Sequence, residues 1–536
     1  MQEKFESFRK QYPVFIYKDY HISAKDGEYV ELTYDFEVPG LCEFHPSNRI
    51  RTSNLEIIND PESETARHLA FSLGMVELVS YWKPMCSPNV EVLCGALSEA
   101  ESEWWKKLYF GGLGEFFFKN GIRTTPSDFM TIKSAGASDD ADDSCGYDSG
   151  SNNVSYGCGD SDCNDGCCCG FSDRNDVNFG CGNSNGSDSS CDDSFGEVPK
   201  LSKVALASGQ RDACPPKPFK NAHIKIIPVG GGKDSCVTME LTREFADKVF
   251  CFTVDDQPAR EESAACAGYT DARMIRTYRT LDKNMLELNA RGFLNGHTPF
   301  SAIVAFLSAY CGYLLGAEQI ILSNESSANE GNLSEKTEFE VNHQYSKSYE
   351  FEKDFSSYLE RSIGVPIKYF SLLRSFNELQ IAKQFSAYKK YHSVFRSCNA
   401  GSKKNIWCDN CAKCLFVYTI LSPFLTEDEM TGIFGENLLT RGDLKEIFDG
   451  LVGFSEVKPF ECVGTHVEIN AALKETAERY IAEGIRLPVL LEYYYDRVPH
   501  ENGTFKELLC EFNRENDIPE EFFSAVDKMY NYVKEV

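Results

Sequence analysis

The stretch that decides the fold runs from His223 to Ser235 and reads HIKIIPVGGGKDS. Its β-branched first half predicts a short buried strand over residues 224–229. Three glycines follow, and the next apolar positions have helical periodicity: Val237, Leu241 and Phe245. Glycine lets a backbone approach a ligand closely, and the N-terminus of a helix carries a partial positive charge. This order of strand, glycine turn and helix predicts a loop that binds a nucleotide phosphate.

The loop differs from a Walker A phosphate loop, which needs GxxxxGK followed by serine or threonine. Here Lys233 is followed by Asp234, and Ile227 stands where the first glycine should be. The pattern GG-x-DS after a strand resembles instead the pyrophosphate loop of the N-type ATP pyrophosphatases, which cleave ATP between its α and β phosphates. A glycine-rich turn without a ligand is the alternative interpretation of this stretch taken alone.

Alternating strands and helices follow the loop. Residues 248–254 and 318–323 have the composition of buried strands, and residues 300–315 are apolar enough for a buried helix. This alternation predicts an α/β fold with a parallel sheet, whose ligands bind at the carboxyl ends of the strands. Polar residues that follow the two strands are expected at this edge: Asp255, Asp256, Asn324 and Glu325.

Nine sequence blocks, in order along most of the chain, resemble the UDP-N-acetylmuramoyl-L-alanyl-L-glutamate epimerase family. The blocks are GLGEFFFKNG (112–121), PVGGGKDS (228–235), GFLNGHTPFSA (292–302), SNESSANEGN (323–332), VNHQYSKSYEFEKDF (341–355), YFSLLRSFNELQIAKQF (369–385), FRSCN (395–399), WCDNCAKC (407–414) and KPFECVGT (458–465). An ordered set of this size is hard to explain by chance.

The resemblance implies an enzyme that uses ATP and Mg²⁺ to invert the terminal L-glutamate of UDP-MurNAc-L-Ala-L-Glu through an acyl-adenylate. It implies AMP and pyrophosphate as further products, a role in peptidoglycan precursor synthesis in the cytoplasm, and a core like that of the adenine nucleotide α-hydrolases. The chemistry is reasonable, because an α-proton beside a carboxylate anion is very weakly acidic and adenylation removes that negative charge.

The glycine loop supplies the main candidates for binding the nucleotide. Pyrophosphate contact is expected from its glycines and its serine: Gly230, Gly231, Gly232 and Ser235. Lys233 is expected to add positive charge, and Asp234 to hold Mg²⁺, which prefers one or two carboxylates together with phosphate oxygens. Lys347 and Arg374 are candidates to neutralise phosphate charge, and a solvated surface cation is the alternative for each.

The candidates for moving the α-proton lie in the family-like blocks. They are His297, His343, Tyr345 and Cys462. Histidine suits proton transfer near neutral pH, and a cysteine with a lowered pKa can invert a carbon centre without a cofactor. An isolated histidine or cysteine is more often a packed residue with satisfied polar groups, which is the alternative here.

Four of the 22 cysteines have the spacing of a metal site. Cys398, Cys408, Cys411 and Cys414 form the pattern C-x9-C-x2-C-x2-C, whose thiolates can surround a tetrahedral ion. A similar cluster binds zinc in 7-cyano-7-deazaguanine synthase, another pyrophosphate-loop enzyme. We favour structural Zn²⁺, and an iron–sulfur cluster and four buried free cysteines are the alternatives.

The composition predicts four segments. Residues 1–133 are expected to form an α+β domain with an antiparallel hairpin around residues 30–38, and residues 201–420 the pyrophosphate-loop domain with the cysteine site. Residues 421–536 are expected to be mostly helical. Residues 134–200 are an insert rich in Asp, Ser, Gly and Cys, in which disorder is expected because few apolar side chains can be buried.

Charge and cysteine usage restrict the partners. The net charge of −28 argues against a nucleic-acid partner, which requires a basic surface. We expect no membrane segment and a reducing, cytoplasmic environment, because the sequence has no long apolar run. A UDP-linked muramoyl dipeptide, which is anionic, then needs local cations at its site. The sequence leaves the oligomeric state open.

Two other functions remain compatible with these motifs. One is a different adenylating enzyme on the same scaffold, which forms an amide, a nitrile or a thiolated product. The other is a non-catalytic nucleotide sensor stabilised by zinc. Deuterium incorporation at the glutamate α-carbon, coupled to AMP formation, separates the epimerase from both.

Overall fold

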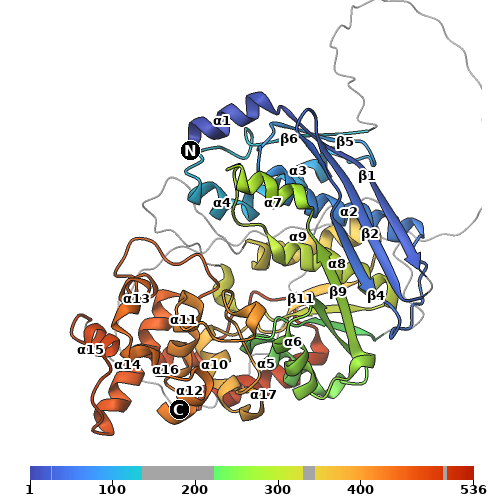
Figure 1. Ribbon diagram of the computed structural model, residues 1–536. Helices are drawn as coiled ribbons and strands as arrows, with labels where there is room; N and C mark the ends of the chain where they lie inside the picture. Colours follow the sequence, from blue (N-terminus) through green and yellow to red (C-terminus); the bar gives the residue numbers. More distant parts are fainter. Residues whose placement is uncertain (26, 136–222, 330–344, 499–503, 536) are drawn as a thin grey trace, which may run out of the picture. The chain divides into compact units, whose positions relative to one another are not determined.

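The computed structural model describes residues 1–25, 27–135, 223–329, 345–498 and 504–535 (Figure 1). These residues belong to one compact unit. Its strands form one sheet of eleven: β1 (Val14–Lys25), β2 (Tyr29–Val38), β3 (Cys42–Phe44), β4 (Ser47–Arg51), β5 (Asn89–Val92), β6 (Thr131–Ser134), β7 (Lys225–Pro228), β8 (Val249–Val254), β9 (Met274–Thr280), β10 (Gln319–Leu322) and β11 (Lys368–Ser371). The fold is therefore α/β, with a large mixed sheet.

Five neighbouring strands of this sheet are parallel, in the order β11-β10-β7-β8-β9. Strand β7 comes first along the chain, so the strand order reverses between β7 and β10. In open α/β sheets, ligands bind beyond the carboxyl ends of the strands at such a reversal. The strands predicted over residues 224–229, 248–254 and 318–323 are confirmed by β7, β8 and β10.

The N-terminal segment extends the same sheet with antiparallel strands. In the β1–β2 hairpin, the alternate residues of β2 from Val30 to Val38 are buried, as the period of two predicted. Strand β4 pairs antiparallel with both β2 and β9, and it thereby joins the hairpin to the parallel strands. Strands β5 and β6 add a parallel edge beside β1.

Helices lie between many of the strands in the sequence (Figure 1). Those before β11 are α1 (Gln2–Gln11), α2 (Glu64–Trp82), α3 (Glu99–Gly112), α4 (Gly114–Lys119), α5 (Lys233–Leu241), α6 (Pro258–Cys266), α7 (Lys283–Ala290), α8 (Phe300–Leu315) and α9 (Tyr349–Tyr358). Helix α8 confirms the apolar helix predicted over 300–315, and it ends at Gly316 in the left-handed conformation.

The sequence predicts one helix that continues to Phe245, and this prediction is wrong at the C-terminal end of the helix. Helix α5 ends at Leu241, and Phe245 lies in a short 3-10 helix, η1 (Arg243–Phe245). The hydroxyl of Thr242 donates to the carbonyl oxygens of Thr238 and Met239, at 2.9 and 3.1 Å. A β-branched residue that bonds the last turn in this way favours a helix end.

The chain after β11 is helical in its described residues. Its helices are α10 (Glu378–Ser386), α11 (Ala412–Leu421), α12 (Glu427–Phe434), α13 (Lys445–Val452), α14 (His466–Ala482), α15 (Val489–Tyr495), α16 (Thr504–Cys510) and α17 (Phe523–Lys534). No helix among the described residues is both long and apolar enough to span a membrane. The division of the chain at residues 133, 200 and 420 stays a prediction.

A buried ion pair joins the N-terminal segment to the parallel strands. The carboxylate of Glu77 on α2 is fully buried and accepts hydrogen bonds from Nε and Nη2 of Arg279 on β9, at 2.7 and 2.6 Å. We expect Glu77→Ala to lower the free energy of unfolding by about 3 kcal/mol, because it leaves an unpaired buried guanidinium. Urea unfolding measures this loss.

The control for this prediction is Glu62→Ala, because both side chains of the ion pair between Glu62 and Arg67 are exposed to solvent. Exposed pairs contribute at most about 1 kcal/mol. Equal effects of the two substitutions would contradict the prediction.

Candidate active site

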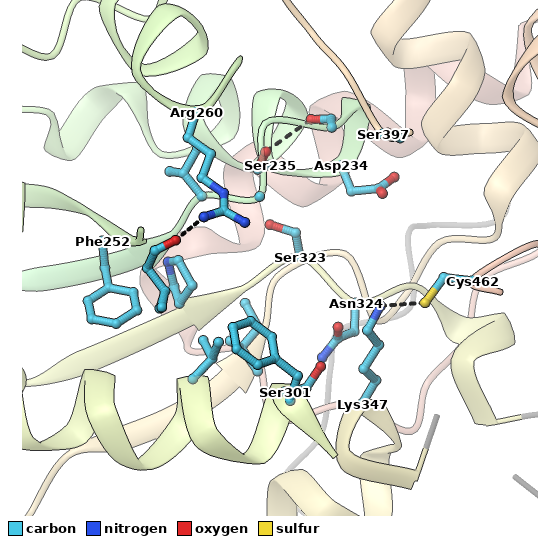
Figure 2. A pocket seen from close by; sticks show the side chains of 18 of the residues that line it. Asp234, Ser235, Phe252, Arg260, Ser301, Ser323, Asn324, Lys347, Ser397 and Cys462 are labelled. Atoms are coloured by element: carbon cyan, nitrogen blue, oxygen red, sulfur yellow. Dashed lines mark hydrogen bonds between the residues drawn. The ribbon is translucent and has the colours of Figure 1, made fainter. Parts of the chain in front are cut away.

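A cavity of about 310 Å³ opens at the carboxyl ends of β7, β8 and β10, where the strand order reverses (Figure 2). Its volume lies within the range of small-molecule sites. The walls come from segments far apart in the sequence, including the starts of α5, α6 and α8. Eight of the predicted site residues line it: Gly230, Gly232, Asp234, Ser235, Asn324, Glu325, Lys347 and Cys462.

The glycine loop forms one wall, and a side chain would be crowded at two of its positions. Gly231 has a φ of +80°, and a Cβ there would lie 3.0 Å from the backbone carbon of Ala259. A Cβ on Gly232 would lie 2.6 Å from Oγ of Ser397. Gly232 is also the N-cap of α5. Because glycine has no side chain that could accept a hydrogen bond, the first backbone N–H groups of the helix remain available to another acceptor. This arrangement suits an anion.

A buried charge cluster lies behind the loop. The ammonium of Lys233 is buried and contacts the carboxylates of Asp234 and Glu378. Burial raises the pKa of Glu378 to about 8; Lys233 and Lys413 oppose this rise, and Asp234 and Glu325 add to it. The neighbouring carboxylates raise the pKa of Lys233 despite its burial, so this side chain stays protonated.

The raised pKa of Glu378 predicts how stability depends on pH. The folded chain holds this proton more tightly than the unfolded chain, whose carboxyl titrates near 4.5. The stabilisation is therefore complete below about pH 4.5 and is lost as the pH rises through about 8. The free energy of unfolding, relative to that of Glu378→Gln, should fall between pH 5 and pH 8 in urea titrations. A difference that stays constant or grows would contradict this assignment.

Two guanidinium groups reach the cavity without a carboxylate partner among the described residues. Arg260 on α6 donates to the carbonyl oxygen of Val254, and Arg396 donates to that of Phe395. The Nε atoms of both arginines are buried and lack a hydrogen-bond partner in the described part of the chain. Figure 2 shows Arg260 and Asp234 reaching into the cavity near Ser235. The two arginines are therefore available to an anionic ligand.

Lys347 and Cys462 meet at another wall of the cavity (Figure 2). The Nζ atom of Lys347 lies 2.8 Å from Sγ of Cys462. Burial lowers the pKa of Lys347, but Cys462 and Glu325 outweigh it and the net shift is upward. The Nζ atom of Lys413 holds the carbonyl oxygen of Cys462. The pair therefore places a sulfur atom and a cation side by side at the wall of the cavity.

Arg374 lies behind the wall and not in the cavity. Its side chain is fully buried and contacts the carboxylate of Glu352. Its Nη1 and Nη2 atoms also donate to the carbonyl oxygens of Glu325 and Lys347, both at 2.6 Å. This geometry supports a positioning role for Arg374, because it holds the backbone of two residues that line the cavity.

The other sequence candidates that the structure describes lie outside the cavity lining. Nδ1 of His297 is 3.1 Å from the carboxylate of Glu115, in the block GLGEFFFKNG. The carboxylate of Asp255 accepts the backbone N–H of Arg279 at 3.0 Å. The hydroxyl of Tyr345 donates to Asp354 at 3.4 Å. His343 lies outside the described residues. The proposed roles of these side chains stay predictions.

Several residues that line the cavity were not assigned a role from the sequence. They are Arg260, Ser301, Ser323, Ser346, Arg396, Ser397, Asn399 and Lys413. Most belong to the family-like blocks, which is the signal that could have found them. Arg260 lies outside every block and reaches the cavity because α6 begins just after β8.

The four cysteines of the predicted metal site come together. All their Sγ atoms lie within 4.8 Å of one another. Three of the separations are 4.0 Å (Cys398–Cys411), 3.8 Å (Cys408–Cys414) and 3.5 Å (Cys411–Cys414). Four thiolates at about 2.3 Å from one zinc ion stand about 3.8 Å apart at the corners of a tetrahedron. The cluster could therefore hold a metal ion, and every described cysteine is a free thiol.

Two family profiles match this chain. The profile of the MurL N-terminal domain matches residues 6–160 and 196–372, and that of the MurL C-terminal domain matches residues 393–502. The chain belongs to the MurL family. The resemblance found in the nine sequence blocks is thereby confirmed.

Three curated relatives carry the name UDP-N-acetyl-alpha-D-muramoyl-L-alanyl-L-glutamate epimerase. The protein from Xanthomonas oryzae pv. oryzae is 36% identical over 261 residues, which are 47% of this chain and 57% of the relative. The Salinispora tropica protein is 35% identical over 275 residues, 51% of this chain and 59% of the relative. That from Micromonospora sp. is 34% identical over 270 residues, 49% and 60% of the two chains. The chain thus matches somewhat more than half the length of these relatives.

The two MurL profiles meet at the cavity. The N-terminal profile covers the glycine loop and Lys347, and the C-terminal profile covers Arg396, Lys413 and Cys462. The residues 161–195 that the N-terminal profile skips lie inside the predicted insert, whose structure is outside the described residues. The candidate site therefore combines residues of both MurL domains.

Proposed function

We propose that this MurL-family chain is an ATP-dependent epimerase. It inverts the terminal L-glutamate of UDP-MurNAc-L-Ala-L-Glu through an acyl-adenylate, in peptidoglycan precursor synthesis. The observation that carries the proposal is one cavity that combines a glycine loop, two arginines without a carboxylate partner in the described part of the chain, and a lysine–cysteine pair. The names of the three relatives support the choice of substrate.

The phosphates of ATP bind at the glycine loop in this proposal. The N-terminus of α5 and the guanidinium groups of Arg260 and Arg396 offer N–H donors and positive charge to the β and γ phosphates. Asp234 and Glu325 are the cavity carboxylates that would hold Mg²⁺, which when bound supplies positive charge beside the phosphate oxygens. Arg260, Arg396 and bound Mg²⁺ would also offset the negative charge of the UDP-linked substrate.

The reaction begins when an oxygen of the glutamate α-carboxylate attacks the α-phosphorus of ATP. The bond between the α-phosphorus and its bridging oxygen breaks, and pyrophosphate leaves. The resulting mixed anhydride has no carboxylate charge beside Cα, so a base can remove the α-proton while the electron pair delocalises into the carbonyl. A proton returns to Cα from the opposite face. Water then attacks the acyl carbon and breaks its bond to the bridging oxygen, which leaves with AMP as the D-glutamate product forms.

Cys462 is the base in this scheme. Its Sγ atom lies at the cavity wall and accepts a hydrogen bond from the ammonium of Lys347 at 2.8 Å. Lys347 is paired with this sulfur before the proton is taken, so it acts as a positioning residue. Both groups are supplied by segments that converge only in the folded chain.

Exchange in D₂O tests the proposal. The full chain is incubated with ATP, Mg²⁺ and UDP-MurNAc-L-Ala-L-Glu, and the glutamate Cα–H signal is followed by NMR. We expect deuterium at Cα, D-glutamate after acid hydrolysis, and AMP, all dependent on ATP. ATP cleavage to AMP without deuterium would contradict epimerisation and favour another adenylating enzyme.

That second candidate is supported by the cysteine cluster beside the glycine loop, which resembles the arrangement in 7-cyano-7-deazaguanine synthase. It predicts a new amide or nitrile when ammonia is added, with no change at the glutamate α-carbon. A nucleotide sensor predicts ATP binding without AMP under any of these conditions.

A further inference from the structure

We propose that the four cysteines bind one Zn²⁺ and that this ion positions two walls of the cavity, so that loss of the metal weakens nucleotide binding. The link is the interleaving of metal ligands with residues that line the cavity. Arg396, Ser397 and Asn399 surround Cys398 in the sequence, and Lys413 lies between Cys411 and Cys414.

The geometry of the cluster suits a single ion with four sulfur ligands. The Sγ separations match the edges of a small tetrahedron, as described above. Backbone N–H groups of Gly401 and Cys414 donate to Sγ of Cys398 and Cys411, at 3.0 and 3.4 Å, and such donors stabilise metal-bound thiolates. In a four-iron cluster each thiolate binds a different iron, which requires wider separations than these.

The first wall is the segment that carries Cys398. The backbone N–H of Arg396 donates to the carbonyl oxygen of Gly231 at 2.8 Å, and Oγ of Ser397 packs against Gly232. The segment therefore contacts the glycine loop directly. A metal bond at Cys398, two residues beyond Arg396, fixes the position of this contact.

The second wall is the segment that carries Cys462, and it is held by contacts with α11. Cys411 is the N-cap of this helix, and its Sγ accepts the backbone N–H of Cys414. Between these two ligands, the backbone N–H of Lys413 donates to the carboxylate of Glu461 at 3.1 Å, and its Nζ holds the carbonyl oxygen of Cys462. The ion therefore also sets the position of the segment that carries Cys462.

The same ion thus connects the glycine loop to the loop of Cys462. Without it, four thiols have only weak contacts to hold the two segments together. The parallel strands depend little on this contact, because Cys398 and Cys414 are only two members of a large apolar core that packs against these strands. Removal of the metal is therefore expected to loosen the cavity walls and leave the sheet folded.

Metal analysis and hydrogen exchange of the full chain test the inference. Mass spectrometry of the purified protein should find one zinc per chain. After removal with a strong chelator, amide exchange should accelerate in residues 395–401 and 411–414 and in Gly230–Ser235, and remain slow in β7, β8 and β10. Added Zn²⁺ should restore protection. A chain without bound metal, with iron in its place, or with unchanged exchange after zinc loss would overturn the inference.

Binding of α,β-methylene-ATP gives a second measurement, which rests on the proposed function. We expect its affinity to fall roughly tenfold or more on zinc removal, because charged donors lose their alignment. If the zinc-loaded chain does not bind this probe, the proposed function fails while the exchange result still decides the inference. Unchanged affinity after zinc loss would overturn the inference.

Two substitutions at one ligand separate metal binding from packing. Cys408 is partly exposed, and Cys408→His retains a ligand because three cysteines and one histidine also bind zinc. It should keep both the metal and the protection of Gly230–Ser235, whereas Cys408→Ser should lose both. Cys266→Ser, outside the cluster, is the control and should change neither. Equal behaviour of the serine and histidine variants would overturn the inference.

Discussion

Cys462→Ala is expected to abolish deuterium exchange at the glutamate α-carbon and leave adenylation intact. The thiol is the proposed proton acceptor, and a positioned acid–base group contributes about 10²–10⁴-fold to rate. In the proposed binding mode the phosphates contact the glycine loop and the two arginines, so the exchange of labelled pyrophosphate into ATP should continue. The two assays on one protein therefore separate proton transfer from activation.

The matched control is Cys510→Ala, because Cys510 is an exposed thiol outside the cavity. This variant should behave like the wild type in both assays. Lys347→Met should slow deuterium exchange as well, because Cys462 then loses the hydrogen-bond donor that positions its sulfur. If Cys462→Ala still exchanges deuterium within about threefold of the wild-type rate, another residue is the base.

Gly230→Ala is expected to prevent nucleotide binding without destabilising the protein. Gly230 lines the cavity, its φ lies outside the left-handed region, and a Cβ on it would meet no atom within 4 Å. The added methyl group occupies space that the proposed phosphates need for close contact with the backbone. We expect affinity for α,β-methylene-ATP to fall about a hundredfold, with an unchanged melting temperature.

Two other glycines make this prediction specific. Gly231→Ala should lose both binding and stability, by roughly 1–2 kcal/mol, because a side chain at a φ of +80° is strained and crowds Ala259. Gly432→Ala, on α12 and also in open space, should bind normally and gain stability. Normal nucleotide binding by Gly230→Ala would show that phosphates do not approach this loop.

The sequence was most informative where function depends on neighbouring residues. The glycine loop could be predicted because strand, turn and helix follow one another directly, and the backbone conformation of Gly231 is a local requirement. The cysteine cluster was predictable for the same reason, since three of its four ligands lie within seven residues. Spacing carries this information without knowledge of the tertiary structure.

Contacts between distant segments could not be predicted. The pairing of β4 with β9 brings residues 47–50 against 277–280, and nothing in either strand specifies the other. Whether Arg374 lines the cavity or supports its wall depends on Glu352, which reaches it only through packing of α9. The same limit applies to the meeting of Lys347 with Cys462, which lie 115 positions apart in the sequence.

The most direct test of the central claim follows an oxygen atom. UDP-MurNAc-L-Ala-L-Glu carrying ¹⁸O in the glutamate α-carboxylate is incubated with the full chain, ATP and Mg²⁺, and the nucleotide product is analysed by mass spectrometry. Attack of the carboxylate on the α-phosphorus predicts AMP that contains one ¹⁸O atom. Unlabelled AMP, or cleavage of ATP to ADP, would contradict the proposal that this cavity activates the substrate as an acyl-adenylate.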